Sequence, residues 1–266
     1  MNRITTTIKR LQSSGQKAFI PFITAGFPDI ESTKQLFSTL ERAGADIIEL
    51  GMPFSDPLAD GPTIQSSSDA AIRSGTTPAA VFECISNIRK ESETPILLFA
   101  YSNLILRYGI SKFMVKLHRS GCDGILVPDL PIEEAEEFKK QANLNNISII
   151  FLVSPLTSVK RMRKIEKLSD DFVYCVSVAG VTGARAGLFD QIQKYLKTVR
   201  KTLRKPFMVG FGVSSGKDAE KIALLSDGVV VGSAILKRID NKKLNIKKIE
   251  KFAFEIHKGI TKAEQV

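Results

Sequence analysis

Two carboxylates, Glu49 and Asp60, are the residues of this sequence best placed to do chemistry. Glu49 closes the apolar run Ile47-Ile48, which reads as a buried strand, and a loop rich in proline and glycine then leads to Asp60. Two acids beside apolar side chains suit acid/base work, because burial and mutual repulsion both raise the pKa of a carboxyl group. We therefore expect Glu49 to hold a proton near neutral pH, and we take both acids as candidate catalytic residues.

The elements that must position these acids alternate regularly along the chain. Short apolar runs, typical of parallel strands buried on both faces, are separated by segments with helical periodicity. This pattern over 266 residues favours an α/β fold, a (β/α)8 TIM barrel, as a single domain spanning residues 1–266. An extra amphipathic helix over residues 2–14 is expected to cover one end. A doubly wound open sheet is the rival, but no G-x-G-x-x-G follows the first strand. The eight predicted strands are 17–23, 46–50, 95–101, 123–127, 147–153, 172–177, 206–210 and 228–232.

Position relative to the strands sorts the acids into two groups. In a barrel of this kind the active site lies at the carboxyl ends of the strands, and the opposite end serves stability. Glu49, Asp60 and Asp129 follow their strands and fall at the functional end. The acids that precede strands are expected to cap loops at the floor; they are Asp46, Asp123, Asp171 and Asp227.

Glycine-rich loops follow the last three predicted strands, in the stretches 179–183, 210–214 and 232–234. Glycine lets backbone N–H groups approach an anion closely, and Ser233 can begin a short helix whose N-terminus faces it. The loops after the seventh and eighth strands are the usual phosphate site of this fold. The pattern indicates a phosphate-bearing substrate.

Other chemistries are disfavoured by where the remaining reactive residues fall. His118 and His257 lie in predicted helices, so histidine triads and histidine–zinc sites are not expected. No lysine stands at a functional strand end to form a Schiff base. We therefore expect no metal and no cofactor in this chain.

Composition sets further bounds on partners and location. The formal net charge is +10, but the basic runs at 197–205 and 237–251 resemble solvated helix faces without an aromatic platform, so nucleic acid is not expected. The apolar runs are too short to span a membrane. Three scattered cysteines, Cys84, Cys122 and Cys175, with no apolar leader, indicate the cytoplasm.

The stretch from Glu49 to Gln65 closely resembles the signature of the tryptophan synthase alpha subunit family. Further matches follow in order over the whole chain, at residues 21–26, 101–103, 128–131, 180–183, 210–212 and 232–233. The departures are mild, such as Leu104 where many relatives have proline. The resemblance implies the retro-aldol cleavage of indole-3-glycerol phosphate into indole and D-glyceraldehyde 3-phosphate.

The resemblance also implies a role for each matching residue. Glu49 would move the proton at the indole ring carbon, and Asp60 would hold the indole N–H. The indole side would include Phe22 and Tyr174, with Thr182 on a loop that closes over the substrate. The phosphate would be bound by Gly183, Phe211, Gly212, Gly232 and Ser233.

The family implies a partner as well, a pyridoxal-phosphate-dependent beta subunit that receives indole within an αββα assembly. The loop 52–60 would form the communicating surface, or else fold onto its own barrel. Three alternatives stay open at this point: a silent alpha-type subunit that only activates its partner, a free-standing indole-releasing lyase, and a phosphate-sugar isomerase on the same barrel. Intact Glu49 and Asp60 favour the enzyme.

Overall fold

Eight parallel strands close into a barrel in the computed structural model, which describes residues 2–176, 188–210, 212–239 and 244–265. Each strand pairs with its neighbours in chain order, and β8 pairs with β1 to complete the ring. The predicted (β/α)8 fold is confirmed. The strands are β1 (Ala18–Thr24), β2 (Ile48–Gly51), β3 (Ile96–Phe99), β4 (Gly124–Leu126), β5 (Ser148–Val153), β6 (Val173–Val176), β7 (Phe207–Gly210) and β8 (Gly228–Val231).

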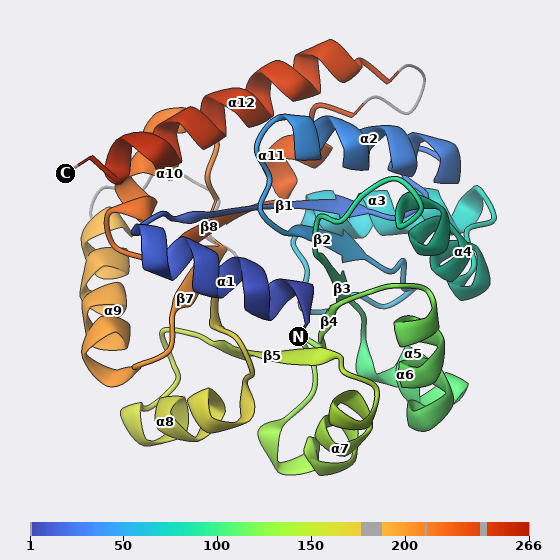
Figure 1. Ribbon diagram of the computed structural model, residues 1–266, viewed down its shortest axis with the longest axis horizontal. Coiled ribbons are helices and arrows are strands. Elements are labelled where there is room, and N and C mark those ends of the chain that lie inside the picture. Colours follow the sequence, from blue (N-terminus) through green and yellow to red (C-terminus); the bar gives the residue numbers. More distant parts are fainter. Residues whose placement is uncertain (1, 177–187, 211, 240–243, 266) are drawn as a thin grey trace.

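Helices surround the ring of strands, and α1 lies across one end of it (Figure 1). The helices are α1 (Arg3–Ser14), α2 (Ile30–Arg42), α3 (Pro62–Arg73), α4 (Pro78–Ile88), α5 (Ser102–Tyr108), α6 (Ile110–Arg119), the 3₁₀ turn η1 (Ile132–Glu134), α7 (Glu136–Leu144), α8 (Val159–Leu168), α9 (Leu188–Thr202), α10 (Gly216–Ala223), α11 (Ser233–Leu236) and α12 (Ile246–Ala263). Helix starts follow local sequence: Asp29 accepts the backbone N–H of Ser32, and Ser215 accepts that of Asp218.

The core has two layers because alternate strand residues face opposite sides of the sheet. One layer fills the barrel, and the other packs between the strands and the outer helices. Ile4, Ile8 and Leu11 of α1 belong to the inner layer. The predicted helix over residues 2–14 therefore closes the barrel floor, as expected from its apolar stripe.

Acids at the floor hold the beginnings of the strands. Asp46 accepts the backbone N–H of Phe19 at 3.0 Å, and Asp227 accepts that of Phe207 at 3.0 Å. Asp123 accepts the backbone N–H of Ile96 and forms an ion pair with Arg89, both at 2.9 Å. The expected structural role is confirmed, with one difference: before β6 it is Asp170 that takes a strand N–H, while Asp171 accepts the hydroxyl of Ser148.

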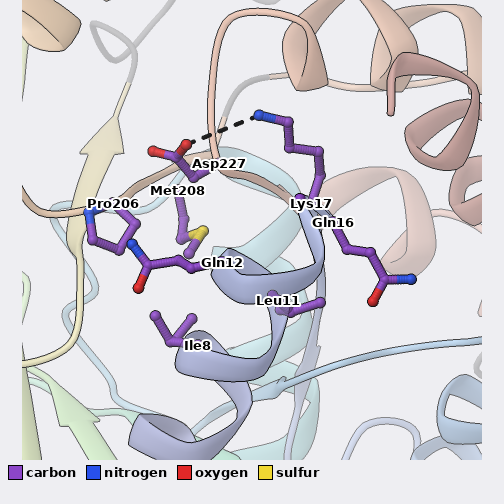
Figure 2. Close-up of a pocket in the computed structure, with 9 residues that line it drawn as sticks. Ile8, Leu11, Gln12, Gln16, Lys17, Pro206, Met208 and Asp227 are labelled. Carbon is purple, nitrogen blue, oxygen red and sulfur yellow. Dashed lines mark ion pairs between the residues drawn. The ribbon is translucent and has the colours of Figure 1, made fainter. Parts of the chain in front are cut away.

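A cavity of about 230 Å³ also lies at the floor, between α1 and the starts of β7 and β8. Figure 2 shows Ile8, Leu11 and Met208 around it, with the Lys17–Asp227 ion pair (3.9 Å) to one side. These residues precede or begin the strands, so this cavity is at the end of the barrel opposite Glu49. Of the helices within the described ranges, none combines the length and apolarity needed to cross a membrane.

Candidate active site

Glu49 lies inside the upper end of the barrel, in the middle of β2. It pairs in register with Phe22 of β1 and Leu97 of β3, and its side chain is only 1% exposed. The hydroxyl of Tyr174 donates a long hydrogen bond of 3.4 Å to Oε2. Among the described residues, Oε1 has no hydrogen-bond partner. A buried carboxyl group with so few donors favours its neutral form.

Burial is the main reason that the pKa of Glu49 rises to about 8, and the negative charge of Asp60 raises it further. The hydrogen bond from Tyr174 acts in the opposite direction but is too long to offset burial. Glu49 is therefore protonated at neutral pH, as the sequence predicts. A glutamic acid in this state can give a proton to a bound molecule.

Asp60 comes from the loop between β2 and α3 and is partly buried. The hydroxyl of Tyr101 donates to its Oδ2 at 3.0 Å and accepts the backbone N–H of Ala59 at 3.1 Å. Burial raises the pKa of Asp60 to about 6, and the Tyr101 hydrogen bond limits that rise. At neutral pH Asp60 is mostly ionised, so the two acids carry different charges at the same end of the barrel.

Tyr101 is the residue that sequence reasoning missed, because its contact with Asp60 joins positions far apart in the chain. It stands directly before α5, whose first residue, Ser102, donates through its backbone N–H (2.8 Å) and its hydroxyl (2.7 Å) to Asp129. Asp129 lies at the functional end, as expected. Its partners make it a positioning residue for the Tyr101 segment.

Aromatic side chains form a connected cluster from Phe22, next to Glu49 in the barrel, to Tyr101, the partner of Asp60. Phe22 meets Phe99 edge to face with ring centroids 5.8 Å apart, and Phe99 meets Tyr101 in the same way at 5.9 Å. Phe54 stacks on Tyr101 at 5.1 Å. Flat apolar walls of this kind fit a planar aromatic ligand.

Two glycines make room for these rings. A Cβ added to Gly51 would lie 2.6 Å from the Cζ atom of Phe22, and one added to Gly210 would lie 2.7 Å from the hydroxyl of Tyr174. Because real Cβ atoms do not approach other atoms this closely, a larger residue at either position would displace a ring. Phe22 and Tyr174, both predicted to line the site, thus depend on glycines of neighbouring strands.

The glycine loops after β7 and β8 lie at this same end. Gly232 is the N-cap of α11, which begins at Ser233, so the predicted short helix is confirmed. The space next to the Cα of Gly232 is filled by Phe22. A Cβ on Gly212 would meet open space. The N–H groups of a first helical turn have no partner within the helix and can bind an anion. Three predicted site residues, Thr182, Gly183 and Phe211, lie outside the described residues.

The arrangement suits proton transfer to a planar, partly apolar molecule that carries an anionic group. Paired carboxylates with separated pKa values are the recognised basis for assigning one as acid and one as base. Within the described residues no group of three histidine, cysteine or acidic side chains is placed to hold a metal ion. His118 and His257 lie in α6 and α12, as predicted.

Comparison with known proteins gives a consistent result. The model of the family described as "Tryptophan synthase alpha chain" matches residues 8–264. The tryptophan synthase alpha chain of Geotalea uraniireducens is 46% identical over 237 residues, which cover 89% of each chain. That of Thermoanaerobacter sp. (strain X514) is 44% identical over 255 residues, 95% of this chain and 97% of the other. The crystal structure of tryptophan synthase subunit alpha from Legionella pneumophila superposes with a TM-score of 0.91 at 32% identity, covering 98% and 99%.

Proposed function

The chain belongs to the tryptophan synthase alpha chain family, the carbon–carbon lyases that cleave indole-3-glycerol phosphate, and we propose that Glu49 and Asp60 carry out that cleavage. The products are indole and D-glyceraldehyde 3-phosphate. The observation that carries the assignment of residues is the fully buried Glu49, with its pKa near 8, beside an Asp60 whose pKa is near 6. One acid holds a proton at neutral pH and the other does not.

Glu49 acts first as the acid. Its proton goes to the ring carbon that bears the glycerol phosphate chain, which leaves the indole ring with a positive charge. The resulting Glu49 carboxylate then takes the proton of the neighbouring hydroxyl group on the chain. As the carbon–carbon bond breaks, its electron pair returns to the ring and neutralises it, and the hydroxyl carbon becomes the aldehyde. Glu49 ends the cycle protonated again, so no cofactor is needed in this chain.

Asp60 stabilises the charged ring. As a carboxylate it accepts a hydrogen bond from the indole N–H, and this bond strengthens when the ring becomes cationic. Interactions that strengthen toward the transition state are the ones that raise the rate. The Tyr101 hydrogen bond supports this role because it keeps Asp60 ionised at neutral pH.

The remaining site residues divide between the two ends of the substrate. Phe22 and Tyr174 line the indole side, where the aromatic walls support a planar ligand. Gly212, Gly232 and Ser233 bind the phosphate, and the position of α11 supports this. We also assign Thr182 to the indole side and the pair Gly183 and Phe211 to the phosphate on the family pattern.

A beta subunit is the expected partner, in an αββα assembly to which it brings the pyridoxal phosphate. The tip of the loop 52–60 supports this interface, because Leu58 is 90% exposed there while Pro53 and Pro57 fold inward. Leu58 is thus available for contact with a second protein on the same loop that carries Asp60. We further propose that residues 1–266 act as a single domain and that the enzyme works in the cytoplasm.

Indole release tests the assignment. The full chain is assayed with indole-3-glycerol phosphate, alone and with a beta subunit, and compared with Glu49→Gln and with the matched surface variant Glu136→Gln. We expect Glu49→Gln to lose at least 1,000-fold in kcat while keeping its affinity for substrate, and Glu136→Gln to equal the parent. Turnover of Glu49→Gln at the parental rate would overturn the residue assignment.

The same assay separates the alternatives. A silent subunit would release no indole in either state yet would raise beta-subunit activity. A free-standing lyase would be fast alone and form no complex. Acceleration of indole release on adding the beta subunit supports the proposed function over both.

A further inference from the structure

A hollow lined by basic residues lies beside the end of α11. It has a volume of about 780 Å³ and is lined by the start of α3, the end of α11, the first turn of α12 and Phe27 of the loop after β1. We call it the α11 groove and define it by Phe27, Thr63, Ser66, Lys237, Arg238 and Lys248. Figure 1 shows α11 between α12 and the α2–α3 side of the barrel.

The charge of the α11 groove is of one sign. Lys237, Arg238 and Lys248 contribute three positive charges, and no carboxylate is among its lining residues in the described part of the chain. Within the described residues, none of these three cations takes part in an ion pair. Cations that share a hollow repel one another, and a bound anion removes that repulsion.

Arg238 is fixed in this groove. Its Nη1 donates to the backbone oxygen of Ala234 at 2.7 Å, and its guanidinium lies 3.4 Å from the ring centroid of Phe252. A fixed guanidinium loses little freedom when it binds an anion, and its planar donors match phosphate oxygens. Thr63 and Ser66 add hydroxyl donors from α3, and Phe27 gives the groove an apolar side.

We propose that the α11 groove is a second binding site for a small molecule that carries a diphosphate group, distinct from the proposed substrate phosphate site. The volume falls in the range of small-molecule sites. The two sites share one short helix: Gly232 and Ser233 stand at its start, and Lys237 and Arg238 follow its end. An anion that pulls on Arg238 also pulls on the carbonyl of Ala234, so occupancy of the groove alters substrate affinity through α11.

Calorimetric titration of the full chain tests this. The protein is first saturated with glycerol 3-phosphate to fill the proposed substrate phosphate site, then titrated with inorganic pyrophosphate and, separately, with adenosine diphosphate. The test variant is Lys237→Ala with Lys248→Ala. The matched control is Lys247→Ala with Lys251→Ala, which removes the same charge from exposed positions of α12 outside the groove.

We expect pyrophosphate to bind the saturated protein, with an affinity at least tenfold lower in the groove variant and within about twofold of the parent in the control. Tighter binding of adenosine diphosphate than of pyrophosphate would show that the ligand carries an organic group, which contacts Phe27. Equal binding of the two would show that the groove recognises the diphosphate group alone. Pyrophosphate should also change the KM for indole-3-glycerol phosphate in the parent, and this effect should vanish in the groove variant.

Two results would overturn the inference. One is an equal loss of affinity in the groove and control variants, which would mean that only net charge matters. The other is that the protein saturated with glycerol 3-phosphate binds no pyrophosphate, which would mean that the groove is not an anion site. Indole release is measured separately, so failure of the proposed function leaves the pyrophosphate titration readable.

Discussion

Replacing Tyr101 by phenylalanine should narrow the pH range over which the enzyme is active. The Tyr101 hydroxyl donates to Asp60 at 3.0 Å and lowers the pKa of that carboxyl group against the effect of burial. Activity needs Asp60 ionised and Glu49 protonated, so kcat/KM should rise with pH near 6 and fall near 8. Without the hydroxyl, the acid limb moves toward neutral pH while the basic limb stays.

The size of the shift follows from the geometry. A hydrogen bond to a charged group contributes about 1.5–3 kcal/mol, and water replaces part of it because Asp60 is partly exposed. One pKa unit corresponds to about 1.4 kcal/mol, so we expect the acid limb to move up by about one unit. The matched control is Tyr174→Phe, which removes a 3.4 Å hydrogen bond to Glu49 and so moves the basic limb upward by well under one unit.

The assay is the pH profile of kcat/KM for indole release, measured on the parent and on both variants. The substrate phosphate also titrates near pH 6, but equally for all three enzymes, so the differences between profiles are used. Tyr101→Phe should narrow the profile and Tyr174→Phe should widen it slightly. An acid limb that does not move in Tyr101→Phe would refute the claim that this hydroxyl keeps Asp60 ionised.

Three further predictions follow from the same geometry. The pKa of Glu49 in the folded protein, about 8, exceeds its ordinary value of 4.5, so the folded state loses stability as the pH rises from 4.5 to 8. Glu49→Gln removes this loss. In urea titrations it should raise the free energy of unfolding by about 2–4 kcal/mol at pH 8 and leave it unchanged at pH 4. Gly210→Ala should displace the Tyr174 ring and lower kcat/KM at least tenfold, and a crystal structure with the ring unmoved would contradict this. Asp227→Asn weakens the ion pair with Arg200 and the hydrogen bond from the Phe207 N–H at the barrel floor. It should therefore lower the free energy of unfolding by about 1–3 kcal/mol and leave kcat within twofold of the parent. A large loss of kcat would show that the floor and the active site are not independent.

The barrel could be predicted from the sequence because its signals are local. Each strand is a short apolar run, and each cap, such as Asp29 or Ser215, lies within three residues of the N–H it accepts. The rule that strand ends divide function from stability then placed Glu49 at the working end. Before β6 the sequence pointed to Asp171 as the acid that holds a strand, whereas Asp170 accepts the strand N–H. Two neighbouring aspartates cannot be told apart until the strand register is known.

The Tyr101–Asp60 and Ser102–Asp129 contacts could not be predicted in this way. They join the loops after β2, β3 and β4, which are adjacent only because those strands are neighbours in the barrel. The signal that could have found Tyr101 is its place just beyond the end of β3, where the strand-end rule applies to a tyrosine as well as to an acid. The α11 groove is built from four separate elements. Its three basic residues lie in the basic run 237–251, but that run does not predict that they meet Phe27 and the start of α3.

The protein uses the same kind of side chain in opposite ways at its two ends. Asp123 and Asp227 at the floor each accept a backbone N–H and pair with an arginine, so their carboxylates have direct donors and hold the strand starts in place. Glu49 at the upper end has one long hydrogen bond and a negative neighbour. A cation near its Oε1 would satisfy that atom and lower the pKa, and the residue would then lack the proton that the cleavage requires. The weak solvation of Glu49 is therefore a condition of its chemistry.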